Sequence, residues 1–324
     1  MSDMEQVEDI IVTGAEAGEI GFDWLLKRVA RPRPVPLRIA VVHPVSASSL
    51  QGAVDAASAG IAAPLYVGPR AKILNAAEQI GASLDSFEIV DVPHSHAAAA
   101  KAVEMVRSGH ASALMKGALH TNELMAEIVK RDDGLRTERR MSHVFLIATS
   151  GYPKPLLISD GAINITPDLM TKKWITQNAI DAARAIGIDP PKVAVLSATE
   201  EVDPTIPNTI EAAALCKMAD RGQIRGGVLD GPLAFDLAVS QEAVAAKGLT
   251  SPIAGDADVL IVPTLEAGNM LAKQLDYLAG ASAAGIVMGA SAPVILTSRA
   301  DGPAERVASC AFAAAVAQWQ EAQE

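Results

Sequence analysis

Residues 293–306, PVILTSRADGPAER, place two chemically useful side chains at the end of an apolar run. The run predicts a buried β-strand, which stops at Ser298 and Arg299. A guanidinium binds phosphate or carbonyl oxygens through charge-assisted, often bidentate hydrogen bonds. A neighbouring hydroxyl is a poor base alone, so it passes a proton only with an acceptor behind it. Gly302 and Pro303 then predict a helix start, with Gly302 as N-cap and Pro303 in the first turn.

Four other apolar segments also end in polar residues or glycine. The strand predicted at 112–117 ends in Lys116, and Thr121 opens the next helix. The strands predicted at 155–160, 226–231 and 257–263 lead to further candidates for binding a ligand: Asp160, Asn164, Gly231, Pro232, Asp236, Gly268, Asn269 and Lys273. Any one of these alone is ordinary turn or cap chemistry. Because ligands bind beyond the carboxyl ends of parallel strands, five such ends predict one shared cleft at one edge of the sheet.

The elements that must position these residues alternate between short β-branched runs and Ala-rich helical stretches. That order predicts an α/β fold with a mostly parallel sheet. The segments 142–149 and 155–160 flank a short turn and predict an antiparallel hairpin. Ser142 and His143 open this hairpin and are weaker candidates for contacting a ligand, with a structural role favoured for His143. In the helix predicted at 208–222, Asn208 and Glu211 have the spacing of a capping box.

Composition limits the classes of function. Half of the 324 residues are apolar but only 3% are aromatic, so the interior is built of aliphatic side chains. The net charge of −11 argues against a nucleic-acid partner, although local cations can still hold one anionic ligand. We find no secretory signal and no apolar run that could span a bilayer, which predicts a cytoplasmic protein without a membrane partner. Cys216 and Cys310 lie in Ala-rich patterns and are expected to be buried, not metal-bound.

Several catalytic motifs are absent from the sequence. It contains no GxxxxGK[ST] loop, no GxGxxG after the first predicted strand and no GxSxG elbow. Instead, five motifs in order resemble the phosphate acetyl/butyryltransferase family: LMKGALHTNELM, the stretch from MSHVFLIATSGYPKPLLISD to ITQNAI, RGGVLDGPLAFDLAVS, ADVLIVPTLEAGNMLAKQL and GASAPVILTSRADGPAERVASCAFAAA. The likeness covers about residues 22–320, and the wording DGAINITPDL and SRAD is most similar to the butyryltransferase branch.

The resemblance implies a reversible reaction, acyl-CoA plus orthophosphate to acyl phosphate plus CoA, by direct attack in a ternary complex. It implies two α/β domains like those of isocitrate and isopropylmalate dehydrogenases, with the active site in the cleft between them. The expected division is a leader at 1–21, a first domain at 22–143 plus 292–324, and a second at 144–291. It also implies a homodimer with no bound cofactor, no metal and no covalent acyl-enzyme, and with coenzyme A as a substrate.

For the site, the resemblance implies that Ser298 relays the proton of the CoA thiol and that Arg299 holds phosphoryl or carbonyl oxygens. Glu305 stands where the acetyltransferases carry an Asp and is the candidate carboxylate behind Ser298, with Asp301 as the alternative. Glu305 could equally serve only the helix dipole. The acyl phosphate or the CoA pyrophosphate would be lined by Lys116, Asp160 and Asn269.

Other interpretations remain open. Gly231 and Pro232 could shape the backbone near the cleft or simply form a tight turn. The helix after Lys116, TNELMAEIV, lacks the Arg that the acetyltransferases place there, so the acyl length stays open from acetyl to butyryl. A decarboxylating dehydrogenase of the same fold and a non-catalytic protein that binds acyl-CoA or acyl phosphate are the alternative functions.

Overall fold

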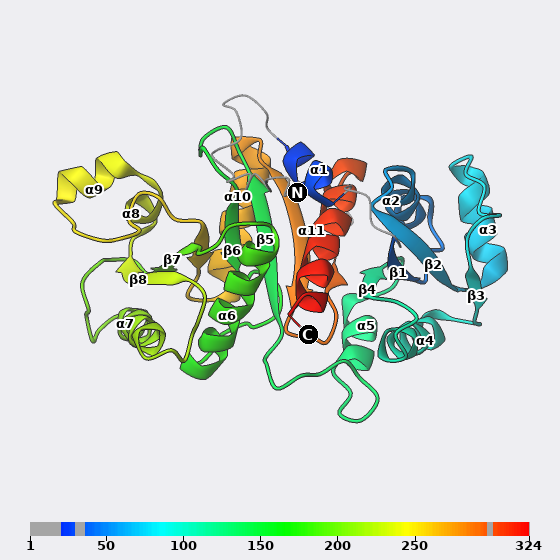
Figure 1. Cartoon of the computed structure of the whole chain (residues 1–324), viewed down its shortest axis with the longest axis horizontal. Helices are drawn as coiled ribbons and strands as arrows, with labels where there is room; N and C mark the ends of the chain where they lie inside the picture. Colours follow the sequence, from blue (N-terminus) through cyan, green and yellow to red (C-terminus); the bar gives the residue numbers. More distant parts are fainter. Residues whose placement is uncertain (1–20, 30–35, 297–300, 324) are drawn as a thin grey trace, which may run out of the picture.

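The strands in the described part of this protein form one sheet of 11 strands in the order β3-β2-β1-β4-β11-β10-β5-β6-β9-β7-β8 (Figure 1). A computed structural model describes residues 21–29, 36–296 and 301–323. Seven of the ten strand pairings are parallel, which confirms the predicted mostly parallel α/β architecture. The strands are β1 Leu37–Val42, β2 Ala62–Gly68, β3 Ile89–Asp91, β4 Ala113–Lys116, β5 Ser142–Ala148, β6 Leu156–Ser159, β7 Lys192–Leu196, β8 Val228–Leu233, β9 Val259–Ile261, β10 Ser282–Met288 and β11 Val294–Ile295.

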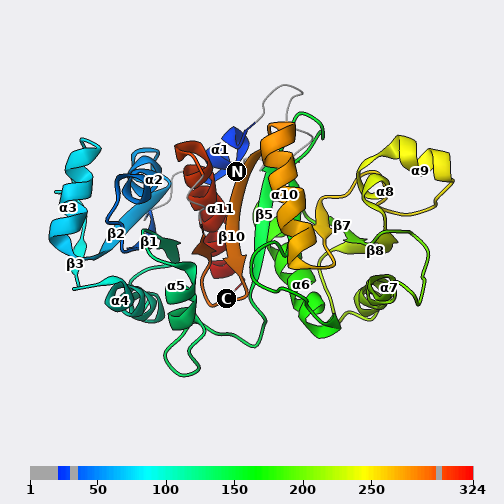
Figure 2. The same cartoon turned by 180° about the vertical axis from the view of Figure 1, so that it is seen from behind.

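Helices cover both faces of the sheet (Figures 1 and 2). They are α1 Asp23–Val29, α2 Ala47–Ser58, α3 Arg70–Gln79, α4 Ser95–Arg107, α5 Thr121–Ile128, α6 Leu169–Ala185, α7 Pro207–Asp220, α8 Phe235–Val239, α9 Gln241–Lys247, α10 Leu265–Ala279 and α11 Pro303–Glu321. Among the described helices, none is both long enough and apolar enough to cross a bilayer.

The alternation of side chains along the strands assigns the helices to the two faces. On β1, Ile39 and Val41 belong to the apolar cluster that includes α2 and α11, whereas Ala40 and Val42 pack in the cluster of α4 and α5. On β5, Leu146 faces the α11 side and Ile147 faces the cluster that contains Leu237 of α8. Both faces of the sheet are therefore buried, as expected for strands of continuous apolar sequence.

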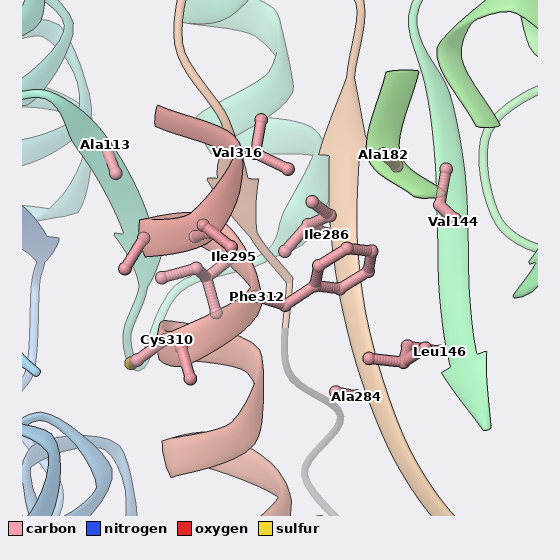
Figure 3. Packing of buried hydrophobic residues seen from close by; sticks show 14 of the residues in the cluster. Ala113, Val144, Leu146, Ala182, Ala284, Ile286, Ile295, Cys310, Phe312 and Val316 are labelled. Carbon is pink, nitrogen blue, oxygen red and sulfur yellow. The ribbon is translucent and has the colours of Figure 1, made fainter. Parts of the chain in front are cut away.

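Helix α11 lies near the middle of the molecule and is buried along most of its length. Figure 3 shows Phe312 of α11 directed towards Ile286 of β10, with Leu146 and Val144 of β5 beyond it. Figure 3 also shows Ile295 of β11 beside α11. Because β11 pairs with both β4 and β10, the last elements of the chain connect strands from both halves of the sheet.

The strand directions correct one expectation. β4 and β11 are parallel to each other, but β10 is antiparallel to β11, β5 to β10, and β6 to β5. β6, β9, β7 and β8 therefore run opposite to β4 and β11. The prediction that five polar strand ends meet at one edge is wrong: those of β4 and β11 lie at one edge, and those of β6, β9 and β8 lie at the opposite edge.

Of two local predictions, the hairpin and the capping box, one is confirmed and the other is wrong. The hairpin is confirmed, since β5 and β6 pair antiparallel from Val144 opposite Ser159 to Ile147 opposite Leu156. The capping box at Asn208 is wrong, because α7 begins at Pro207 and Ile206 precedes it. Lys172 of α6 instead donates to the Asn208 side chain at 2.7 Å and to the Glu211 carboxylate. The two residues therefore join α7 to α6 through a buried ammonium.

Candidate active site

A cavity of about 330 Å³ opens beyond the carboxyl end of β4. It is bounded by the loop after β4, the N-terminal turns of α2, α4 and α5, and the first turn of α11. Its lining residues are Ser46, Ser48, Ser49, Ser95, Met115, Lys116, Gly117, Ala118, Leu119, His120, Glu123 and Arg306. Hydroxyl groups, two cations and one carboxylate thus surround a space large enough for a small anionic group.

Lys116 is the predicted site residue that this cavity contains. Its ammonium donates to the carbonyl oxygens of Gly117 at 3.3 Å and Leu119 at 3.4 Å, which hold it at the end of the strand. Opposite, the Glu123 carboxylate accepts a hydrogen bond of 2.6 Å from the Ser95 hydroxyl. That hydrogen bond is the main reason why the pKa of Glu123 lies below its usual range. Thr121 starts α5 as predicted but is exposed and does not line the cavity.

Arg306 is one of the cavity residues that sequence reasoning missed. Its side chain is only 7% exposed and donates through Nη1 to the carbonyl oxygen of Ser48. Its Nε is buried and has no hydrogen-bond partner among the described residues. A cation in the first turn of a helix opposes the helix dipole, which favours anions there. That unfavourable position was the available signal that Arg306 serves something other than the helix.

The segment with Ser298 and Arg299 lies outside the described residues. Its two flanks are described. On one side, Ile295 of β11 pairs with Met115 of β4, so the chain leaves the sheet beside the strand that ends in Lys116. On the other side, α11 begins at Pro303 and carries Arg306 into the cavity. Both ends of residues 297–300 are thus attached to elements that build this cavity.

Glu305 occupies the helix start predicted for it. Gly302 is the N-cap of α11 and Pro303 stands in the first turn, as expected. The Glu305 carboxylate turns back towards Gly302: a Cβ placed on that glycine would lie 2.7 Å from Glu305 Oε2. Its backbone oxygen accepts a hydrogen bond of 2.8 Å from the Ser309 hydroxyl. This arrangement fits the helix dipole role, while Asp301 just ahead of it is partly exposed.

The structure gathers a second group of predicted residues around the Asp160 carboxylate. Asp160 follows β6 and is 2% exposed. It accepts hydrogen bonds from the backbone N–H of His143 at 3.2 Å and from the Asn164 side-chain amide at 2.6 Å. The backbone N–H groups of Ala162, Ile163 and Asn164 also donate to it, at 2.9, 3.1 and 3.0 Å. Its oxygens are therefore engaged in ordering the loop after β6.

Three more candidates pack against this loop. The Asn269 side chain of α10 donates to the carbonyl oxygen of Gly161 at 3.2 Å. Gly268 is needed for close approach, since a Cβ there would lie 2.6 Å from the Asp160 carbonyl oxygen. Ser142 is fully buried and its hydroxyl accepts a hydrogen bond of 2.9 Å from the Asn178 side chain. These contacts are internal to the protein.

His143 lies in the same group and is 2% exposed. Its ring contacts Phe145 edge to face, with centroids 4.3 Å apart, and its Nδ1 has no hydrogen-bond partner among the described residues. Burial lowers the pKa of His143 to about 4, although the Asp160 charge partly opposes that shift. His143 is therefore a neutral core residue at pH 7, in line with the structural role favoured from the sequence.

The remaining candidates lie elsewhere. Gly231 and Pro232 are inside β8, not in a turn after it. Because β8 is an edge strand, its proline removes no hydrogen bond that the sheet needs. Asp236 of α8 lies 3.6 Å from the Lys247 ammonium. Lys273 pairs with Asp276 one turn along α10, at 3.1 Å. The structure thus does not bring these residues to the cavity beside β4.

The comparisons with known proteins agree with each other. A family model described as phosphate acetyl/butaryl transferase matches residues 94–314. The phosphate acetyltransferase of Rhizobium meliloti is 58% identical over 274 residues, which are 85% of this chain and 87% of the relative. The phosphate butyryltransferase of Clostridium acetobutylicum is 42% identical over 285 residues, 88% of this chain and 93% of the relative. The sequence motifs resemble the butyryltransferase branch, but the overall identity is higher to this acetyltransferase than to this butyryltransferase.

A solved structure extends the likeness to the fold. The branched-chain phosphotransacylase from Enterococcus faecalis V583 superposes with a TM-score of 0.78 at 31% identity, covering 87% of this chain and 99% of that one. Sequence and fold therefore point to the same group of proteins along most of the chain. The resemblance seen in the five sequence motifs is confirmed, and this chain belongs to the phosphate acetyl/butyryl transferase family.

Proposed function

We propose that this protein is a phosphate acyltransferase that moves a short acyl group, acetyl to butyryl, between coenzyme A and orthophosphate. The observation that carries the proposal is the cavity beside β4. Lys116 and Arg306 line this space of about 330 Å³, which is large enough for a phosphate and lies next to both flanks of the Ser298-Arg299 segment. Family membership supplies the reaction class, and relatives named for acetyl and for butyryl transfer support the range of acyl groups.

The chemistry needs three things from the chain. An oxygen of phosphate attacks the thioester carbonyl, the carbonyl oxygen becomes negative, and the C–S bond breaks as the CoA thiolate leaves and takes up a proton. In this proposal Lys116 and Arg306 bind the phosphate dianion through charge-assisted hydrogen bonds, which are stronger than those between neutral groups. Arg299 stabilises the carbonyl oxygen as its charge develops, and Ser298 passes the proton to and from sulfur. Glu305 or Asp301 supports Ser298.

The Asp160 group receives a positioning role in this proposal. Its carboxylate is already occupied by hydrogen bonds from its own loop, so it is not free to bind a phosphate. We assign it to shaping the far wall of the site, where the second domain, residues 144–291, would meet the first, residues 22–143 with 292–324. The placement of β11 between β4 and β10 supports attaching the C-terminal segment to the first domain. We further propose that the protein is a homodimer.

The test is phosphate-dependent release of CoA thiol from acetyl-, propionyl- and butyryl-CoA, measured with a thiol reagent. We expect turnover with all three, because one methylene changes discrimination by only about 1–3 kcal/mol. Ser298→Ala and Arg299→Ala should each lower kcat by at least about 100-fold, as is typical for removing a proton relay or an oxyanion donor. Circular dichroism should show that both variants stay folded.

Three outcomes would overturn the proposal. Rates near wild type in both variants would remove Ser298 and Arg299 from the reaction. Nicotinamide reduction with a hydroxy acid, dependent on a divalent metal, would identify a dehydrogenase instead. Binding of acyl-CoA without any thiol release would leave the non-catalytic alternative.

A further inference from the structure

A second, larger cavity of about 1000 Å³ lies on the α6 side of the sheet, away from the carboxyl end of β4. It is bounded by α6, the loop after α7, the segment that follows β10, and the C-terminal turns of α11. Its size is at the upper end of the range for small-molecule sites. No role in the proposed acyl transfer uses it.

The lining of this cavity is basic in an acidic protein. Among the described residues, five cations and only two acidic residues, Glu138 and Asp181, line it, although the whole chain has 27 basic and 38 acidic residues. The cations are Arg139, Lys173, Arg184, Arg221 and Arg225. A local excess of positive charge against a net charge of −11 concentrates anions at this place.

Two of the cations are neutralised by fixed partners, and three are not. Arg139 pairs with Asp181 at 2.5 Å, and Arg184 pairs with Asp189 at 3.1 Å. Lys173, Arg221 and Arg225 form no ion pair with any described residue. Uncompensated guanidinium groups at the mouth of a cavity are the usual means of binding phosphate oxygens.

Flat aromatic surface lies beside these charges. The chain has three tryptophans, and two of them, Trp174 and Trp319, line the cavity. The Lys173 ammonium lies 4.4 Å from the centre of the Trp174 ring, and the Arg184 guanidinium 5.6 Å from that of Trp319. Indole rings next to guanidinium groups stack with the bases of nucleotides.

The backbone around the cavity is held in place before any ligand binds. The Gln177 side-chain amide of α6 donates to the carbonyl oxygen of Arg225 at 3.0 Å and accepts from its N–H at 2.9 Å. The Arg225 Nε donates to the carbonyl oxygen of Gly222 at 2.8 Å. These bonds fix the loop after α7 against α6 and leave the outer nitrogens of Arg225 available. A site that is ordered in advance loses less entropy on binding.

We propose that this cavity binds a nucleotide, with the base stacked on Trp174 or Trp319 and the phosphates held by Arg221 and Arg225. A free adenosine nucleotide and the nucleotide end of coenzyme A would both present an adenosine phosphate to this site. The site is separate from the cavity of Lys116, but α11 connects them, since it carries Arg306 in its first turn and Trp319 in its last turns. Thirteen residues of helix separate the two by about 20 Å.

The experiment is a titration of the full-length protein with ADP in the absence of metal, followed by tryptophan fluorescence and repeated by calorimetry. We expect ADP to quench the fluorescence to saturation, and adenosine or inorganic phosphate alone to bind at least about 10-fold more weakly. Arg221→Gln with Arg225→Gln should weaken ADP binding at least about 10-fold while thiol release under saturating acyl-CoA and phosphate stays unchanged. Arg131→Gln, an exposed arginine elsewhere on the surface, is the matched control.

A second titration with CoA separates the two sources. Loss of the ADP signal as CoA is added, with the same sensitivity to the arginine variants, would assign the site to the nucleotide end of CoA; ADP binding that CoA leaves unchanged would assign it to a free nucleotide. Equal quenching by inorganic phosphate, or ADP affinity that the double variant leaves intact, would overturn the nucleotide site. Because the readout is binding, these results do not depend on whether the proposed acyl transfer is correct.

Discussion

Single residues in this protein differ in where their side chains lie: some are buried or hydrogen-bonded within their own loop, and others reach a cavity. In the sequence, Asp160 and Lys116 both stand at strand ends and are candidates to bind a ligand, whereas His143 opens the hairpin and is a weaker candidate. In the structure Asp160 is saturated by its own loop and His143 is buried, while Lys116 reaches a cavity. The sequence shows residue types and strand ends, but not which hydrogen bonds the neighbouring loop has already made.

The buried His143 carries a prediction about pH and stability. The folded pKa is about 4, below the value of about 6.5 expected in the unfolded chain. As the pH falls below about 6.5 the unfolded chain takes up the proton first, so the free energy of unfolding should fall between pH 6.5 and 4, by up to about 3 kcal/mol. Urea unfolding at pH 7.5, 5.5 and 4.5 measures this loss.

His143→Gln should flatten that pH dependence, because it removes the titrating ring. His120→Gln, at an exposed histidine, serves as the control and should retain the wild-type slope. An identical slope in all three proteins would show that the ring of His143 takes up its proton equally well in the folded state.

At the scale of elements, the position of Arg306 depends on how α11 packs against α2. Gly52 of α2 is where the two helices come closest, since a Cβ added there would lie 2.8 Å from both Cβ and Cδ of Arg306. The glycine therefore leaves room for an arginine stem between two helices that come from opposite ends of the sequence. A pattern search finds each helix separately but not the contact between them.

Gly52→Ala tests this packing. Alanine is favoured over glycine inside a helix by about 1 kcal/mol, so propensity alone predicts a more stable protein. We expect the opposite here, a less stable protein. The displaced Arg306 side chain should also raise the KM for phosphate at least about 5-fold, because small misplacements of a binding group are costly. Thermal melts and initial rates measure both effects.

Ser58→Ala, at an exposed position of the same helix, should leave KM unchanged. A Gly52→Ala variant that is more stable and binds phosphate normally would show that the α2–α11 contact does not position Arg306.

At the scale of the whole molecule, the fold class was predictable and the strand directions were not. Alternating apolar and helical segments are local patterns, so they predicted an α/β sheet and the β5–β6 hairpin. Which edge each strand end faces depends on the antiparallel pairs β11–β10 and β10–β5 in the middle of the sheet. The β10–β5 pair joins residues that are distant in sequence, with Ser282 opposite Ala148 and Met288 opposite Ser142, and no local signal marks it.

The central position of β11 predicts the outcome of truncation. A chain that ends at residue 291 lacks the strand between β4 and β10 and the helix that covers them. We expect it to show no cooperative thermal transition, since a buried strand and the large apolar surface under α11 are lost together. Calorimetry measures this, and a chain shortened only by residues 322–324 should melt like the wild type.

A native-like transition in the shorter chain would mean that the two parts of the sheet are stable without their connection.

The position of β11 beside β4 also affects how the sheet can assemble during synthesis. β1 to β4 leave the ribosome before the rest of the sheet, but the strand that lies beside β4 is translated only after β10. The nascent chain must therefore carry an open strand edge at β4 while most of the remaining sequence is synthesised, and such edges are prone to pair with other chains. Slow synthesis of the segment between β4 and β11 would lengthen the time for which this edge is open.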